Sequence, residues 1–159
     1  MIAVGATREL DRLKAGDVVA LYAAKGSEVE TASIDAAARE RGLVVVYPRV
    51  IDGERVLTFA AVERSALVTA NHGLHEPQAG EPVVSLDAIA LCFVPGVAFD
   101  RDGGRIGWGR GHYDATLVRA PAARRFALAF ECQVVERIER EDHDAPMNAI
   151  ITEVATHVV

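Results

Sequence analysis

Residues 88–114 are AIALCFVPGVAFDRDGGRIGWGRGHYD, and this stretch decides the fold class. The apolar run Ala88–Val94 predicts a buried strand, and the segment Tyr113–Arg119 is compatible with a helix. Between them, five of the chain's thirteen glycines fall within residues 103–111. A strand, a glycine-rich loop and a helix in this order place backbone N–H groups and a helix N-terminus against an anion. The stretch therefore predicts an α/β fold with a phosphate-binding loop.

The glycine-rich loop differs from the two best-known nucleotide motifs. Gly104 and Gly109 have the spacing of a P-loop, but Arg110-Gly111 stands where that motif requires Lys-Ser/Thr. Gly107, Gly109 and Gly111 give GxGxG without the later glycine of a dinucleotide fingerprint. A mobile surface loop is the alternative interpretation. The two arginines of the loop argue against it, because guanidinium groups are shaped to bind phosphate.

The composition is that of one soluble globular domain. The chain has 159 residues, which is enough to bury a core, with 50% hydrophobic and 25% charged residues. Its net charge of −6, without a basic stripe, disfavours nucleic acid as a partner. A local basic loop can still bind a small anion within an acidic protein.

The N-terminus and the cysteines bear on the cellular location. Residues 1–6 carry no basic residue ahead of their apolar part, which is unlike a signal peptide, and no apolar stretch approaches membrane-spanning length. Cys92 and Cys132 both lie in apolar, strand-like runs, which predicts buried thiols rather than disulfides. We expect a cytoplasmic protein without a membrane partner, either a monomer or a homodimer.

Strand and helix patterns alternate along the rest of the chain. Strands are expected at Val18–Ala23, Leu43–Tyr47, Arg125–Phe130 and Ala149–Thr152, and helices at Thr7–Lys14 and from Thr31 or Ser33 to Glu40. A turn at Asp52-Gly53 predicts a hairpin within Arg49–Phe59, and residues 60–87 are expected to be mostly irregular. The order predicts parallel βαβ units. The fold expected is a single α/β domain over residues 1–159, with a largely parallel twisted sheet flanked by helices. Ligands of such sheets bind at the carboxyl ends of the strands.

Two carboxylates are candidates for chemistry at that edge. Glu28 follows the first predicted strand, although a solvated helix N-terminus is the alternative reading of its position. Asp114 begins the helix behind the loop, where it could hold a Mg²⁺ ion that bridges to nucleotide phosphates. Helix N-capping is the alternative for Asp114, and capping would not exclude the metal role.

Together these motifs resemble those of a known family. VPGVAFD at 94–100 and GRIGWGRGHYD at 104–114 closely resemble the signature of the 5-formyltetrahydrofolate cyclo-ligases, also called 5,10-methenyltetrahydrofolate synthetases. Weaker landmarks of the same family are EVET at 28–31, GLHEP at 73–77 and IITE at 150–153. The resemblance runs from about Val18 to the C-terminus, and its glycine-loop part is highly specific.

The resemblance implies an ATP- and Mg²⁺-dependent ligase of one-carbon metabolism. In this family the N5-formyl oxygen of 5-formyltetrahydrofolate takes a phosphoryl group from MgATP. N10 then attacks the activated carbon, and loss of phosphate leaves 5,10-methenyltetrahydrofolate. Such chemistry depends mainly on positioning and charge stabilisation, which loop amides and arginines can supply.

The resemblance also assigns roles to residues. The ATP-binding set would be Arg105, Ile106, Gly107, Trp108, Gly109, Arg110, Gly111, His112 and Tyr113. Of these, Arg110 and Tyr113 would act at the reacting centre. Glu28 would accept hydrogen bonds from the pterin ring, with Trp108 and His112 also beside the substrate and the Trp108 ring able to stack on it. The metal ligands would be Asp114 and Asn148.

Three departures from the family pattern leave other functions open. The chain is expected to lack the family's additional basic N-terminal helix, His112 stands where tyrosine is usual, and Asn148 replaces an expected acidic residue. A non-catalytic folate- or nucleotide-binding relative is the main alternative. An α/β enzyme that acts on another phosphorylated substrate is the third reading.

Overall fold

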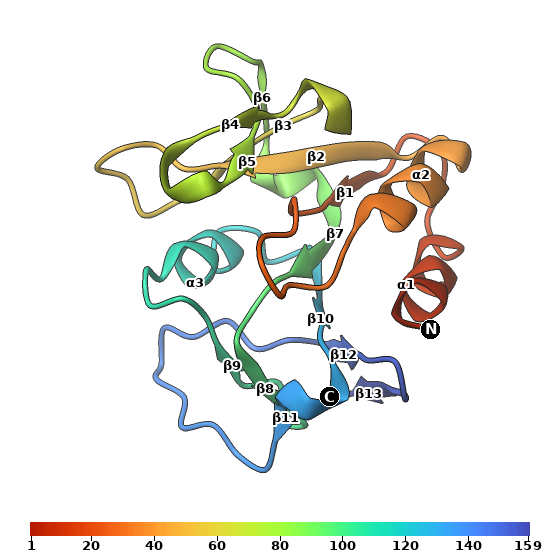
Figure 1. Cartoon of the computed structure of the whole chain (residues 1–159), viewed down its shortest axis with the longest axis vertical. Helices are drawn as coiled ribbons and strands as arrows, with labels where there is room; N and C mark the ends of the chain where they lie inside the picture. The colour runs from red at the N-terminus through yellow and green to blue at the C-terminus, as the bar shows by residue number, and fades with distance from the viewer.

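The computed structural model describes residues 1–159, except for the side chain of His72. A sheet of eight strands forms the centre of the fold (Figure 1). Five strands lie parallel, in the order β2 (Val44–Arg49), β1 (Val18–Ala20), β7 (Ile89–Val94), β10 (Arg124–Leu128) and β12 (Ala149–Ile151). Antiparallel strands extend both edges: β13 (Thr156–Val158) beside β12, and β3 (Thr58–Ala60) and then β6 (Val83–Val84) beside β2. The largely parallel sheet expected from the sequence is confirmed.

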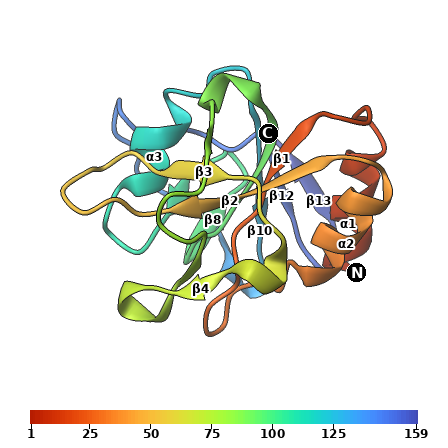
Figure 2. The ribbon, with the colours of Figure 1, turned by 90° about the horizontal axis from the view of Figure 1, so that it is seen from above.

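Helices cover both faces of this sheet. Figures 1 and 2 place α1 (Ile2–Leu10) and α2 (Ala32–Glu40) on one side and α3 (His112–Leu117) on the other. Two smaller sheets are formed by β8 (Ala98–Asp100), β9 (Arg105–Ile106) and β11 (Val134–Val135), and by β4 (Val68–Thr69) and β5 (His75–Glu76). Short 3-10 helices occupy Arg64–Ala66, Asn71–Gly73, Leu86–Ala88 and Glu131–Gln133. No helix in the described part of the chain is long and apolar enough to cross a membrane.

The two faces of the sheet bury two separate cores. Side chains alternate between the faces along a strand, so Val19 joins the core under α1 and α2 while Ala20 joins the core under α3. The same alternation sends Phe93 to the first core and Val94 to the second. A strand covered on both faces must be apolar at every position, which is why β1 and β7 are continuous apolar runs in the sequence.

Several element bounds differ from the sequence expectation. The first helix covers Ile2–Leu10 rather than Thr7–Lys14, because Ile2, Ala6 and Leu10 lie one helical turn apart and are buried together in the core. Strand β2 continues through Pro48, which pairs with Phe59. Residues 60–87, expected to be mostly irregular, contain three short strands. Cys132 is exposed, whereas Cys92 is buried as expected.

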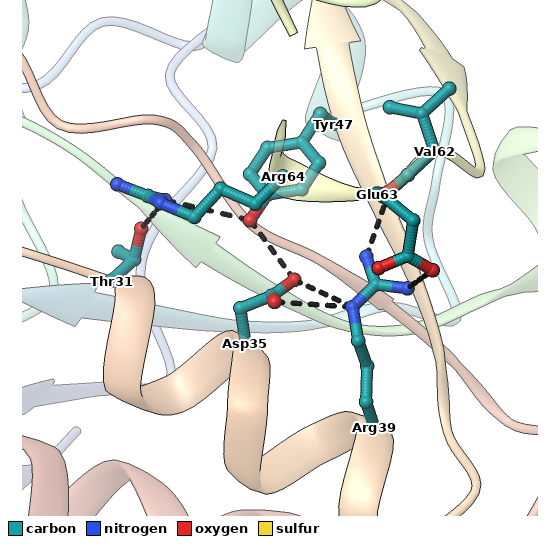
Figure 3. A network of polar contacts seen from close by, with 7 residues as sticks. All are labelled: Thr31, Asp35, Arg39, Tyr47, Val62, Glu63 and Arg64. Atoms are coloured by element: carbon teal, nitrogen blue, oxygen red, sulfur yellow. Dashed lines mark hydrogen bonds and ion pairs between the residues drawn. The ribbon is translucent and has the colours of Figure 1, made fainter. Parts of the chain in front are cut away.

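A polar network joins α2 to β2 and to the segment after β3 (Figure 3). Asp35 is only 7% exposed, and its Oδ1 accepts the Tyr47 hydroxyl at 3.0 Å and the Arg39 Nε at 3.1 Å. Arg39 also donates to Glu63 Oε1 at 2.8 Å and to the Val62 carbonyl at 2.7 Å. Burial is the main effect that raises the pKa of Tyr47 to about 12, so its hydroxyl stays protonated and donates.

A second arginine extends this network to the loop that follows β1. Arg64 donates to Thr31 Oγ1 at 3.1 Å and to Glu30 Oε2 at 3.2 Å (Figure 3 shows the first contact). The Thr31 hydroxyl in turn donates to the carbonyl of Tyr22 at 2.6 Å. The two ends of the loop between Tyr22 and Thr31 are therefore fixed to each other, and Arg64 holds the second end.

Asp35→Ala should lower the free energy of unfolding by about 2–4 kcal/mol, because it leaves a guanidinium and a buried hydroxyl without their shared acceptor. Glu63→Ala is the matched control: it removes the other carboxylate on Arg39, but one whose side chain is 69% exposed. That control should change stability by less than about 1 kcal/mol. Urea denaturation followed by circular dichroism measures both, and equal losses would contradict the role given to Asp35.

Candidate functional site

A cleft opens at the carboxyl edge of the sheet, where the strand order reverses. The chain leaves β1 toward β2 on one side and leaves β7 toward β10 on the other, so the loops after β1 and β7 diverge. The cleft between them has a volume of about 870 Å³. It is lined mainly by the loop after β1, the β2–β3 hairpin, residues 74–76, Pro95, residues 105–114 and the segment from Ile138 to His143.

Every residue from Arg105 to Asp114 lines this cleft, and Glu28 lines it from the opposite loop. The structure thus brings together the predicted phosphate-binding residues and the predicted pterin-binding carboxylate. It also shows a hairpin that the sequence expectation lacked: residues 101–104 form its turn and Arg105–Ile106 form β9, so the first part of the predicted loop belongs to this hairpin. The hairpin is closed by a 2.7 Å hydrogen bond from the Val97 N–H to the Ile106 carbonyl.

Asp100 holds the turn of this hairpin. Its carboxylate is 1% exposed and accepts three backbone N–H groups, from Asp102 at 3.0 Å, Gly104 at 2.7 Å and Ile138 at 2.7 Å. A Cβ atom on Gly104 would come within 2.6 Å of an Asp100 oxygen, so only glycine allows this approach. Asp100 therefore joins two walls of the cleft, the glycine-rich loop and the segment that contains Ile138.

Arg105 and Asp114 form an ion pair within the cleft. Arg105 Nη2 lies 2.9 Å from Asp114 Oδ2, and the two side chains are 5% and 19% exposed. Asp114 Oδ1 accepts the Ala145 N–H at 3.3 Å, and the Arg105 guanidinium lies 5.7 Å from the centre of the Tyr113 ring. The Arg105 Nε is buried without a hydrogen-bond partner among the described residues. The ion pair leaves this donor unsatisfied.

Asp114 is the predicted metal ligand that lines the cleft, where it is paired with Arg105. Among the described side chains, no group of three or more His, Cys, Asp or Glu residues could hold a metal ion. Mg²⁺ commonly uses one or two protein carboxylates together with substrate phosphates, so a single carboxylate beside a cleft of about 870 Å³ is compatible with such an ion. Asn148 does not line the cleft, and its Oδ1 accepts the Arg125 N–H at 2.8 Å. Its metal role stays a prediction.

The other predicted residues differ in exposure. Burial is the main effect that raises the pKa of Tyr113 well above 10, so the phenol stays protonated and can donate a hydrogen bond. Arg110 is exposed at the cleft, where a ligand can reach it. The His112 Nδ1 lies 2.9 Å from the carbonyl oxygen of Arg55, a residue of the β2–β3 hairpin.

Glu28 and Trp108 meet across the cleft. The Trp108 Nε1–H donates to Glu28 Oε1 at 3.1 Å, and the Lys25 N–H donates to Glu28 Oε2 at 2.8 Å. The Trp108 side chain was expected to stack on a ligand ring, and with 66% of the residue exposed it remains accessible for that. The structure adds a polar contact between two residues far apart in the sequence.

Two cleft residues were given no role by sequence reasoning. Glu76 is 7% exposed, accepts the Val50 N–H at 3.3 Å, and has its pKa raised, chiefly by burial. The sequence did mark this residue, because Glu76 lies in the GLHEP landmark at 73–77. Arg55 lies against Gly111, with Nη2 2.6 Å from the place a Cβ atom would occupy. No motif marks Arg55, so only the hairpin geometry reveals it.

Comparisons with known proteins point to one family. The model of the 5-formyltetrahydrofolate cyclo-ligase family matches residues 4–153. A 5-formyltetrahydrofolate cyclo-ligase of Mus musculus is 28% identical over 147 residues, covering 85% of this chain and 72% of the relative. That of Mycolicibacterium smegmatis is 30% identical over 143 residues, covering 86% and 74%.

Two solved structures are also similar. An Aquifex aeolicus 5,10-methenyltetrahydrofolate synthetase superposes with a TM-score of 0.79 at 27% identity, covering 99% of this chain and 80% of that one. A Mycoplasma pneumoniae 5,10-methenyltetrahydrofolate synthetase gives a TM-score of 0.74 at 20% identity, covering 94% and 81%. The second likeness is one of fold alone.

Glu76→Gln should remove one contribution to the fall in the free energy of unfolding with rising pH. Because burial raises the pKa of Glu76, the folded protein keeps this proton to a higher pH than the unfolded chain does. As pH rises through the range between the ordinary and the raised pKa, the free energy of unfolding of the native protein should therefore fall. The variant lacks this fall.

Urea denaturation of both proteins between about pH 4 and pH 8 tests the Glu76 prediction. The difference in stability between variant and native protein should grow with pH. Glu81→Gln is the control, because Glu81 is exposed and should leave the pH profile unchanged. Parallel profiles for Glu76→Gln and the native protein would contradict the prediction.

Proposed function

Because this chain belongs to the 5-formyltetrahydrofolate cyclo-ligase family, we propose that it closes 5-formyltetrahydrofolate to 5,10-methenyltetrahydrofolate with consumption of ATP. The N5-formyl oxygen takes the terminal phosphoryl group of ATP, and N10 attacks the formyl carbon. The bond from that carbon to the phosphate oxygen then breaks. ADP, phosphate and the proton of N10 are the other products.

One observation carries this proposal: Glu28 faces the glycine-rich loop across a single cleft of about 870 Å³. A carboxylate suits the N–H groups of a pterin, and loop amides with Arg110 suit phosphate oxygens. The two reacting partners would therefore lie side by side, which is the main requirement of phosphoryl transfer.

The residues of the loop have distinct tasks in this proposal. Arg110 neutralises charge on the transferred phosphoryl group, and Tyr113, protonated because its pKa is raised, donates a hydrogen bond at the reacting centre. Asp114 would hold Mg²⁺ together with the phosphates of ATP. Bound there, the ion would supply further charge neutralisation. We place the reaction in the cytoplasm, where folate coenzymes and ATP are available.

The direct test is the absorbance of the methenyl product after 5-formyltetrahydrofolate, ATP and Mg²⁺ are added to the purified protein. An ATP-dependent rise is expected. A flat trace, beside an active cyclo-ligase as control, would overturn the proposed reaction. It would favour the alternative of a relative that binds folate or nucleotide without turnover.

Asp114→Ala should lower the affinity for MgATP to that for ATP without metal, because it removes the carboxylate proposed to hold the ion. Asp102→Ala is the matched control, an exposed carboxylate that lies outside the cleft, and it should bind MgATP as the native protein does. Isothermal titration calorimetry with and without Mg²⁺ measures both affinities. Unchanged MgATP binding by folded Asp114→Ala protein would refute the metal assignment.

A further inference from the structure

Trp108 is held in an unusual way for an exposed aromatic residue. It is the chain's single tryptophan, it lies between Gly107 and Gly109, and it is 66% exposed. Packing alone gives little reason for such a side chain to keep one orientation. The contact that orients its polar end is the 3.1 Å hydrogen bond from Nε1 to Glu28 Oε1.

That hydrogen bond completes the fixation of the Glu28 carboxylate. The Lys25 N–H already donates to Oε2 at 2.8 Å, so each carboxylate oxygen receives one donor, from opposite walls of the cleft. A carboxylate bound in this way cannot rotate freely about its terminal torsion, which is otherwise broad. Each oxygen still has a lone pair for a ligand N–H.

The position of Trp108 is itself fixed from the side of the glycine-rich loop. A Cβ atom on the preceding residue, Gly107, would lie 2.5 Å from Arg105 Nη1, so the loop backbone packs directly on this guanidinium. Arg105 is anchored by Asp114 at 2.9 Å. A continuous series of contacts therefore runs from Asp114, through Arg105 and the loop backbone, to the indole and to Glu28.

We infer that Trp108 is a positioning residue whose indole N–H orients the Glu28 carboxylate for binding of the pterin ring. The inference rests on the proposed function, because it takes Glu28 as the group that binds the pterin. It differs from a stacking role in one respect that can be measured: the N–H is required, and the aromatic ring alone is insufficient.

The experiment replaces tryptophan by 3-benzothienylalanine during expression, which puts sulfur in place of the indole N–H and keeps the shape of the ring. Because the chain has one tryptophan, only position 108 changes. The dissociation constant for 5-formyltetrahydrofolate should rise about tenfold, as for the loss of a hydrogen bond to a charged group. KM for the folate should rise in the same way, while kcat should stay within about twofold of the native value. This is the pattern expected when binding is lost equally in the ground state and the transition state.

Two controls separate this role from a structural one. Protein that contains 5-fluorotryptophan keeps the N–H and should bind the folate as the native protein does. Affinity for MgATP should be unchanged in the benzothienyl protein, because the substitution keeps the backbone N–H of position 108, the other loop amides and Arg110, which are the groups proposed to bind phosphate. Native folate affinity in the benzothienyl protein would overturn the inference, and so would an equal loss of folate and MgATP binding.

A spectroscopic measurement tests the hydrogen bond without reference to activity. ¹⁵N-labelled protein has one indole N–H signal, and in Glu28→Ala this signal should move upfield as the charged acceptor is removed. An unmoved signal would overturn the inference even in an active enzyme. The two proposals can also fail separately. If the protein forms no methenyl product but its folate binding depends on the N–H, the proposed reaction is overturned and the inference is supported.

Discussion

The pairing of β1 with β7 is the constraint on which the rest of the structure depends. These neighbours are parallel, yet the chain leaves them in opposite directions, toward β2 and toward β10. Hydrogen bonding holds the two strands together while their following loops are forced apart. The same pair thus lies in the middle of both cores and carries the loops that line the cleft, so the stability of the sheet and the geometry of the site cannot be separated.

Three carboxylates of the cleft already accept a donor before any ligand arrives. Glu28 accepts from backbone and indole N–H groups, Asp114 from Arg105, and Glu76 from the Val50 N–H. Fixed donors and acceptors of this kind recognise a ligand by the directions of its hydrogen bonds more than by net charge. Recognition by hydrogen-bond direction is compatible with the proposed binding of phosphate by a protein of net charge −6.

Much of the fold could be predicted from the sequence because buried parallel strands are continuous apolar runs, as at Ile89–Val94. The β8–β9 hairpin could not, since its strands are only three and two residues long and depend on the Asp100 carboxylate. In the site, residues 105–114 are local in sequence, so their common position at the cleft could be predicted, while their binding of phosphate stays a prediction. The hydrogen bond from Trp108 to Glu28 joins distant segments, and no periodicity or spacing encodes it.

The central strand pair also sets the order in which the molecule can assemble. During synthesis β2 follows β1 closely. The other edge of β1 can pair only after β7 has been synthesised, because Val18 pairs with Ile89 there. Closing so long a chain loop is slow, because its entropy is lost before the contacts form. An intermediate that has joined only β1 and β2 exposes an unpaired apolar edge, which is prone to wrong pairing with another chain. The walls of the cleft cannot come together without this pairing, so the assembly of the site depends on the closure of a long chain loop.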